Sequence, residues 1–185
     1  MTLSLSEWAK YRDLLTKISQ KAADEFKDAV WGANGRWKGA GLGAIPREDL
    51  VDYAYALVSK YSEGSAELAC QMYDKMAKLS GKKLPSAEPA EPATLWDVRR
   101  SLNSAMQTSS NPDYVSSTVS RYVKQTSQDT TLKNAKRDGA EFAWIPSGDP
   151  CPFCITLAAN GADEQQALRA VGAVIEERLC GKRRH

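Results

Sequence analysis

Residues 46–79, PREDLVDYAYALVSKYSEGSAELACQMYDKMAKL, decide the fold. Pro46 suits the first position of a helix, because its fixed φ angle and missing N–H cost nothing there. After it, apolar side chains recur every three or four positions on one stripe, the spacing of an amphipathic helix. The stripe consists of Leu50, Tyr53, Ala54, Leu57 and Tyr61 before Gly64, and of Leu68, Met72, Met76 and Leu79 after it. The pattern predicts either one long helix bent near Gly64 or two consecutive helices.

A second helix is predicted upstream. Ser4, with Glu7 three residues later, has the pattern of a capping box. The helical stripe that follows is Trp8, Tyr11, Leu15, Ile18, Ala22, Phe26 and Val30, which predicts a helix from about Leu5 to Trp31. Between the two helices, residues 32–46 hold five glycines without the pattern of a phosphate-binding loop, so we expect a surface loop there.

Downstream, residues 82–93, KKLPSAEPAEPA, carry three prolines and little apolar content. Such a composition favours an extended linker, and it is the best candidate for a domain boundary. Beyond it, Thr94 and Asp97 are placed to cap a helix that runs to about Thr108. The pair Asn111-Pro112 opens a further helix. The interior positions of that helix are Val115, Val119, Tyr122 and Val123.

These elements indicate a mainly α protein: a multi-helix scaffold with a small strand-turn-helix corner near the C-terminus that carries a CxxC motif. The expected division is an N-terminal helical domain at 1–81, the Pro-rich linker at 82–93, a helical segment at 94–140 and a CxxC-containing segment at 141–185. We expect residues 1–81 to fold by themselves.

Composition sets the broad class. The chain has 185 residues, 42% of them apolar, and 25 basic against 23 acidic residues give a net charge of +2. This is a globular composition without an overall signal for polyanion binding. No apolar run is long enough for a membrane span, and no signal peptide is expected, so we expect a cytosolic product. Four cysteines in a reducing compartment should form no disulfide framework, and Cys70 is expected to be buried.

The motif Cys151-Pro152-Phe153-Cys154 is the strongest chemical signal. It lies between a strand-like run at 141–145 and a helix-like run at 155–159, as in thioredoxin-like and glutaredoxin-like redox proteins. That fold needs further strands, however, whereas 161–185 has the pattern of one helix and a basic tail. Zinc is the second interpretation, with Cys180 and His185 as the remaining ligands. The third is a pair of reduced thiols packed as small apolar groups.

Three basic residues near the end of the chain form the only charge run. Lys182, Arg183 and Arg184 are candidates for a weak, non-specific and salt-dependent contact with DNA, or they simply make the end of the chain soluble.

Residues 132–161, LKNAKRDGAEFAWIPSGDPCPFCITLAANG, resemble a family signature. The segment is similar to the Mu protein F-like minor capsid or head morphogenesis proteins of tailed phages and prophages. The matching positions are Phe142, Ala143, Pro146, Ser147, Gly148, Cys151, Phe153, Cys154, Leu157, Ala158 and Gly161. The resemblance implies a low-copy, non-enzymatic virion component that acts with portal and with capsid or scaffold proteins. It also implies a location in the bacterial host cytoplasm and then in the virion, at the capsid interior or the portal vertex.

The chain departs from that family after Gly161. Family members continue with a His-rich segment that ends in Cys-x-Cys and looks like a metal site together with the CxxC motif. Here residues 162–185 have the pattern of an alanine-rich helix. Either the metal site has been lost, or the coding sequence has been truncated or shifted in frame. We therefore expect a phage head structural or assembly protein without a cofactor. The alternatives are a zinc-binding nucleic-acid module and, third, a glutaredoxin-like thiol redox protein.

Overall fold

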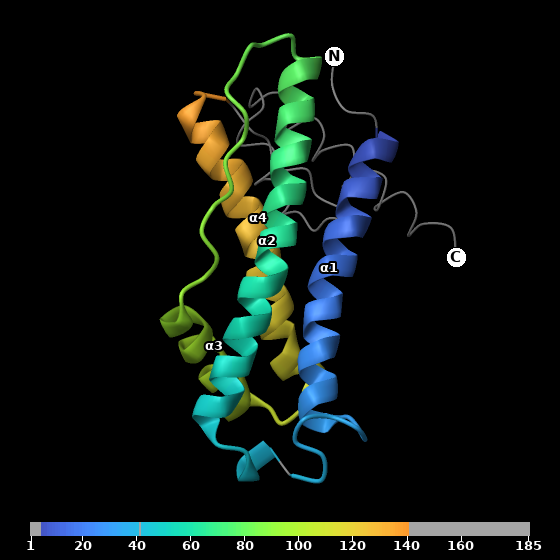
Figure 1. Ribbon diagram of the computed structural model, residues 1–185, viewed down its shortest axis with the longest axis vertical. Coiled ribbons are helices and arrows are strands. Elements are labelled where there is room, and N and C mark those ends of the chain that lie inside the picture. Colours follow the sequence, from blue (N-terminus) through green and yellow to red (C-terminus); the bar gives the residue numbers. More distant parts are fainter. Residues whose placement is uncertain (1–4, 41, 141–185) are drawn as a thin grey trace, which may run out of the picture. The chain divides into compact units, whose positions relative to one another are not determined.

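The computed structural model describes residues 5–40 and 42–140, and within these residues the protein is helical throughout, with no strand (Figure 1). Its elements are α1 (Leu5–Trp31), a short 3-10 helix η1 (Leu42–Ala44), α2 (Arg47–Leu79), α3 (Leu95–Thr108) and α4 (Pro112–Arg137). None of these helices combines the length and the apolar character that crossing a membrane would require. The prediction of a mainly α scaffold is confirmed.

The helix bounds follow the capping signals closely. The Thr94 side chain accepts a hydrogen bond from the Asp97 N–H at the start of α3, and Asn111 does the same for Asp113 at the start of α4, where Pro112 is the first residue. The region around Gly64 resolves into one continuous helix, α2. A single helical glycine costs about 1 kcal/mol relative to alanine, which is too little to break a helix of 33 residues held by tertiary packing.

The core lies where α1, α2 and α4 run side by side, with α3 closing one end. Its fully buried side chains come from all four helices and include Phe26, Leu50, Val58, Leu102 and Val119. The stripe of α1 is buried only in its second half, from Ala22 to Val30, whereas its earlier positions are half-buried. α2 and α4 each pack against all of the other helices, and the contact between these two is the most extensive in the bundle.

The Pro-rich segment returns the chain along the bundle. Figure 1 shows α2 and α4 running in the same direction, so the chain must travel back before α4 begins. Residues 82–94 make that return in an extended conformation. An extended chain of this length reaches about 40 Å, which matches the roughly 39 Å length of the 26-residue α4.

Side chains of α4 hold this extended segment in place. Asn134 is fully buried, accepts from the Glu88 N–H at 2.9 Å and donates to the Glu88 carbonyl at 2.8 Å. The Ala90 N–H donates to Thr130 Oγ1 at 3.0 Å. Arg137 donates to two further carbonyls, those of Pro85 and Ser86. Polar side chains thus replace the partners that a neighbouring strand would give this backbone.

Residues on both sides of the Pro-rich segment belong to one compact unit that extends to Asp138. The composition of 82–93 predicts a domain boundary there, but α4, which follows that segment, packs on α1 and α2, which precede it. The Pro-rich composition explains the extended conformation, and the contacts with Thr130 and Asn134 make the segment part of the unit. The predicted strand-turn-helix corner at 141–185 lies outside the described residues.

Polar side chains also line the contact between α2 and α4. Ser65 Oγ donates to the Val123 carbonyl at 2.7 Å, and Thr126 Oγ1 donates to Ser62 Oγ at 2.9 Å. Ser62, Ser65 and Thr126 are all buried. Because these side chains are small, the two helices can approach closely, and because each hydroxyl has a partner, burying it carries little penalty.

Candidate functional site

The site residues predicted from the sequence lie outside the described residues. They are the candidate metal ligands Cys151, Cys154, Cys180 and His185, the tail residues Lys182, Arg183 and Arg184, and the signature positions Phe142, Pro146, Ser147, Gly148, Phe153, Leu157 and Gly161. Cys70 is described: its thiol is free and buried, as expected, and burial raises its pKa. Between Leu5 and Ala140, Gly41 excepted, no three His, Cys, Asp or Glu side chains are grouped so that they could hold a metal ion.

The described part of the chain offers a different candidate, a groove between α3 and α4. The two helices are joined by residues 109–111 and lie against each other. Tyr122 of α4 fixes this arrangement, since its hydroxyl donates to the Asp97 carbonyl at 2.9 Å and is bonded to Ser101 Oγ at 2.6 Å. The buried positions of α3 are Val98, Leu102 and Ala105, and this register leaves the neighbouring polar positions at the edge that faces α4.

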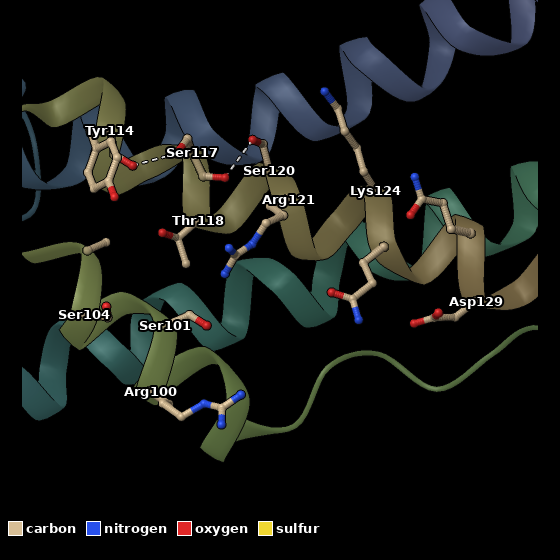
Figure 2. A pocket seen from close by; sticks show the side chains of 13 residues that line it. Arg100, Ser101, Ser104, Tyr114, Ser117, Thr118, Ser120, Arg121, Lys124 and Asp129 are labelled. Atoms are coloured by element: carbon tan, nitrogen blue, oxygen red, sulfur yellow. Dashed lines mark hydrogen bonds between the residues drawn. The ribbon is translucent and has the colours of Figure 1, made fainter. Parts of the chain in front are cut away.

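The groove has a volume of about 1060 Å³. Its lining comes from α3 and from most of the outward face of α4, and nearly all of the lining residues carry a polar or charged group, although carbon atoms make up as much of the exposed lining as polar atoms do. The residues that matter here are Arg100, Ser104, Tyr114, Thr118, Arg121, Lys124, Gln125, Gln128 and Asp129. Figure 2 shows the Arg121 side chain reaching from α4 towards α3, whereas the Arg100 side chain extends along α3 on the side away from α4 and Lys124 extends away from α3.

The cations of the groove are not neutralised by carboxylates. Six other basic side chains of the described residues form ion pairs, for example Lys27 with Asp113 at 2.6 Å and Arg99 with Glu48 at 2.6 Å. Arg100, Arg121 and Lys124 take part in none of the ion pairs found among the described residues. The lining therefore holds three cations against the single carboxylate of Asp129.

Two exposed aromatic side chains accompany these cations. Tyr114 lines the groove and is 48% exposed, and Trp96, one turn before Arg100 on α3, is 62% exposed. The Arg100 guanidinium lies over the Trp96 ring, 4.6 Å from its centroid. An aromatic ring at this exposure has a face that a ligand can contact, whereas both faces of a buried ring are covered by core side chains.

A second hollow of about 1000 Å³ lies beside α1 and the loop after it. Its charged lining residues are balanced: Lys17, Lys21 and Arg36 against Asp24, Glu25 and Asp28. The balance gives this hollow no preference for a ligand of either charge, which distinguishes it from the groove.

The perturbed ionisable groups of the bundle lie away from the groove and serve the fold. Burial, and then the hydrogen bond to Asp138 at 2.9 Å, raise the pKa of Tyr73 to about 12. The hydrogen bonds that Asp138 accepts from Arg137 lower its own pKa. At the other end, the hydrogen bond from Tyr61 lowers the pKa of Glu25. These clusters join α2 to the end of α4 and to α1.

Helical periodicity and capping signals do not reveal the groove, although the chain contains a signal for it. From Arg99 to Gln128 there are four basic residues and only one carboxylate, Asp113, which is taken by Lys27. The overall charge of +2 hides this local excess of cations within a nearly neutral chain. Only the packing of α3 on α4 brings Arg100 and Arg121 to one groove.

A family of known proteins matches nearly the whole chain. The model of this family, described as VG15 protein, covers residues 2–179. That range includes the four helices and continues past Gly161 through most of the segment in which the sequence departs from the Mu protein F-like pattern. No curated protein and no solved structure matches the chain. Because the family match extends over nearly all of its residues, this protein belongs to the phage-related VG15 protein family.

Proposed function

We propose that this protein is a structural or assembly component of a phage head: a non-enzymatic minor capsid component that acts with the portal and with capsid or scaffold proteins. The observation that carries the proposal is the match to the VG15 protein family over residues 2–179. The resemblance of residues 132–161 to the Mu protein F-like signature supports the assignment to the head.

The geometry of the bundle is consistent with a scaffold that presents this signature. The signature segment begins in the last turns of α4, and the described unit ends at Asp138. That end is held firmly, because Arg137 and Asp138 are paired at 2.8 Å and Tyr73 of α2 donates to the same carboxylate. The end of the described bundle at Asp138 is therefore joined to α2.

The proposal places the protein in the host cytoplasm during assembly and afterwards in the virion. The direct test is co-expression with the portal, capsid and scaffold proteins of the same phage, followed by affinity purification, with a tail protein as the control bait. We expect the chain to co-purify with at least one head protein and not with the tail protein. Antibody detection should also place it in purified heads.

A variant pair sharpens this test. Phe153→Ala with Leu157→Ala alters two signature positions, and Arg12→Gln alters an exposed position of α1 as the matched control. We expect the signature variant to lose head-protein binding and the control to keep it. Absence of the chain from heads, together with no association with any head protein, would refute the proposed function.

A further inference from the structure

The groove between α3 and α4 has the electrostatics of an anion site. Arg100 of α3 and Arg121 of α4 both line it, Arg121 reaches towards α3 (Figure 2), and the ion pairs of the described residues leave both arginines without a carboxylate. Cations that line one groove without carboxylate partners give it a positive potential, which a bound anion neutralises. An arginine also presents several N–H donors in a planar fork that suits phosphate oxygens.

The remaining lining suits an extended ligand better than a single ion. From Tyr114 to Asp129 the lining follows α4 over 16 residues, whose ends are roughly 22 Å apart at 1.5 Å per residue. Along this length stand hydroxyl and amide groups, including Thr118, Gln125 and Gln128. Such groups commonly bond the phosphate and sugar oxygens of a nucleic acid.

The exposed aromatic side chains indicate which kind of nucleic acid fits. Trp96 and Tyr114 are 62% and 48% exposed and lie beside the groove's cations. Bases stack on such rings only when they are unpaired, since bases within a duplex already stack on one another. A cationic groove with stacking rings is the common arrangement of proteins that bind single strands.

We propose that the groove between α3 and α4 binds a single strand of nucleic acid, with Arg100 and Arg121 on phosphates and with Trp96 and Tyr114 stacking on bases. The proposed site consists of residues of α3 and α4 and includes none of the basic tail residues 182–184. This proposal does not depend on the proposed function. Its test uses the pure protein without any head protein, so either proposal can fail while the other stands.

The test measures binding of the full chain to a fluorescein-labelled oligothymidylate of about 15 nucleotides by fluorescence anisotropy. Titrations run between about 50 and 200 mM salt, because the slope of log affinity against log salt counts phosphate contacts. The variants are Arg100→Gln with Arg121→Gln, and separately Trp96→Ala. The control Arg12→Gln removes one positive charge, as each single arginine variant does, from an exposed position outside the groove.

The expected result is specific for the groove. The double arginine variant should lose about tenfold or more in affinity, and its salt slope should fall by about 1.4, or about 0.7 for each lost contact. Trp96→Ala should weaken binding about fivefold or more. Arg12→Gln should bind as the wild type does. Affinity and salt slope that are unchanged in the double variant would overturn the proposal.

The basic tail is controlled in the same experiment. Lys182→Gln, Arg183→Gln and Arg184→Gln are combined, and the groove variants are repeated in that background. The proposal requires that the groove substitutions lower the affinity for the single strand both in the wild-type background and in the background with the neutralised basic tail. It fails if neutralising the tail alone abolishes binding. All groove substitutions are at exposed positions, so the circular dichroism spectrum and the melting temperature should be unchanged. If the double arginine variant does not fold, the two single arginine variants replace it in the binding measurements.

Competition distinguishes other anions. An unlabelled single strand should displace the probe at lower concentration than a duplex of the same sequence, polyglutamate or inorganic phosphate. Preference for the duplex, or equal displacement by polyglutamate that depends on Arg100 and Arg121, would overturn the proposal in favour of that ligand. Displacement by inorganic phosphate at micromolar concentration would overturn it in favour of a site for the ion alone.

Discussion

At the scale of single residues, Gly35 and Gly64 differ in what surrounds them. A Cβ atom on Gly35 would lie 2.1 Å from the Asp28 carbonyl oxygen, near the end of α1, where the backbone cannot move aside. A Cβ atom on Gly64 would meet no atom within 4 Å. The loop after α1 therefore needs glycine at 35, whereas α2 does not need it at 64.

We expect opposite effects from the same substitution at these two positions. Gly64→Ala should raise the free energy of unfolding by about 0.5–1 kcal/mol, since alanine loses less entropy in a helix. Gly35→Ala should lower it by about 2 kcal/mol or more, because the new methyl group overpacks against backbone. Urea unfolding followed by circular dichroism gives both values. A stabilising Gly35→Ala would contradict this account of the loop.

Tyr73 makes stability depend on alkaline pH. Its folded-state pKa of about 12 lies above the usual value of 10, because burial and the bond to Asp138 favour the neutral phenol. A raised pKa gives stability that is fully present below pH 10 and is lost as the pH rises towards 12. The melting temperature should therefore fall across this range, and less steeply in Tyr73→Phe. If the melting temperatures of the wild type and Tyr73→Phe fell equally steeply with pH, Tyr73 would not be the cause of the loss of stability.

The cysteine pair at 151 and 154 gives a prediction from sequence alone. We expect no tightly bound zinc, because four ligands must converge for a structural site, and two of them would be Cys180 and His185. The sequence predicts a helix over 163–179 that would be about 25 Å long and would carry Cys180 away from Cys154. Elemental analysis of the purified protein should find far less than one zinc per chain. Stoichiometric zinc that survives mild chelation and is lost in Cys180→Ser would show the opposite.

At the scale of elements, the extended segment at 82–94 depends on α4. Its prolines lack N–H groups, and several of its remaining backbone groups are bonded by Thr130, Lys133, Asn134 and Arg137. Asn134 contributes most, since it pairs with both the N–H and the carbonyl of Glu88. Asp74 of α2 adds one bond, since it accepts from the Ala87 N–H at 2.8 Å, so a segment without a partner strand is held mainly by side chains of α4.

Asn134→Leu should detach this segment. The substitution keeps the approximate size of the side chain but leaves the Glu88 N–H and carbonyl without their partner, at a cost of about 2 kcal/mol or more. Hydrogen exchange at the Glu88 amide should accelerate at the same time. Thr131→Ala is the matched control, because the Thr131 hydroxyl donates to a carbonyl of its own helix. Unchanged exchange at Glu88 would mean that Asn134 does not hold the segment.

At the scale of the whole molecule, α4 makes the fold of residues 5–138 one unit. The core cluster joins Val115, Val119 and Val123 of α4 to side chains of α1 and α2. A fragment of residues 1–81 would expose the faces of α1 and α2 that pack on α4, so the structure predicts that it does not melt cooperatively. A fragment of residues 1–140 should do so. Thermal melting of both fragments tests this, and a cooperative melt of 1–81 would restore the N-terminal domain expected from the sequence.

The sequence by itself determined which segments are helical, since caps and apolar periodicity are local properties, although it left open whether residues 46–79 form one helix or two. Thr94, Asn111 and Pro112 mark helix starts within a few residues of chain. Buried Cys70 followed from composition and compartment. The similarity of residues 132–161 to a phage family signature is also a property of consecutive residues, so it needs no knowledge of the packing.

Only the tertiary structure decided which polar residues are core and which cations share a groove. Thr126, Thr130 and Asn134 look like solvent-facing residues in the sequence, yet they are buried because their partners come from α2 and from the extended segment. Arg100 and Arg121 are separated by 20 other residues and line one groove only because α3 packs on α4. The periodicity of one helix predicts which of its positions are buried and which are exposed. Hydrogen-bond partners and clusters of like charge depend on two segments that only folding brings together, so they cannot be predicted from either segment alone.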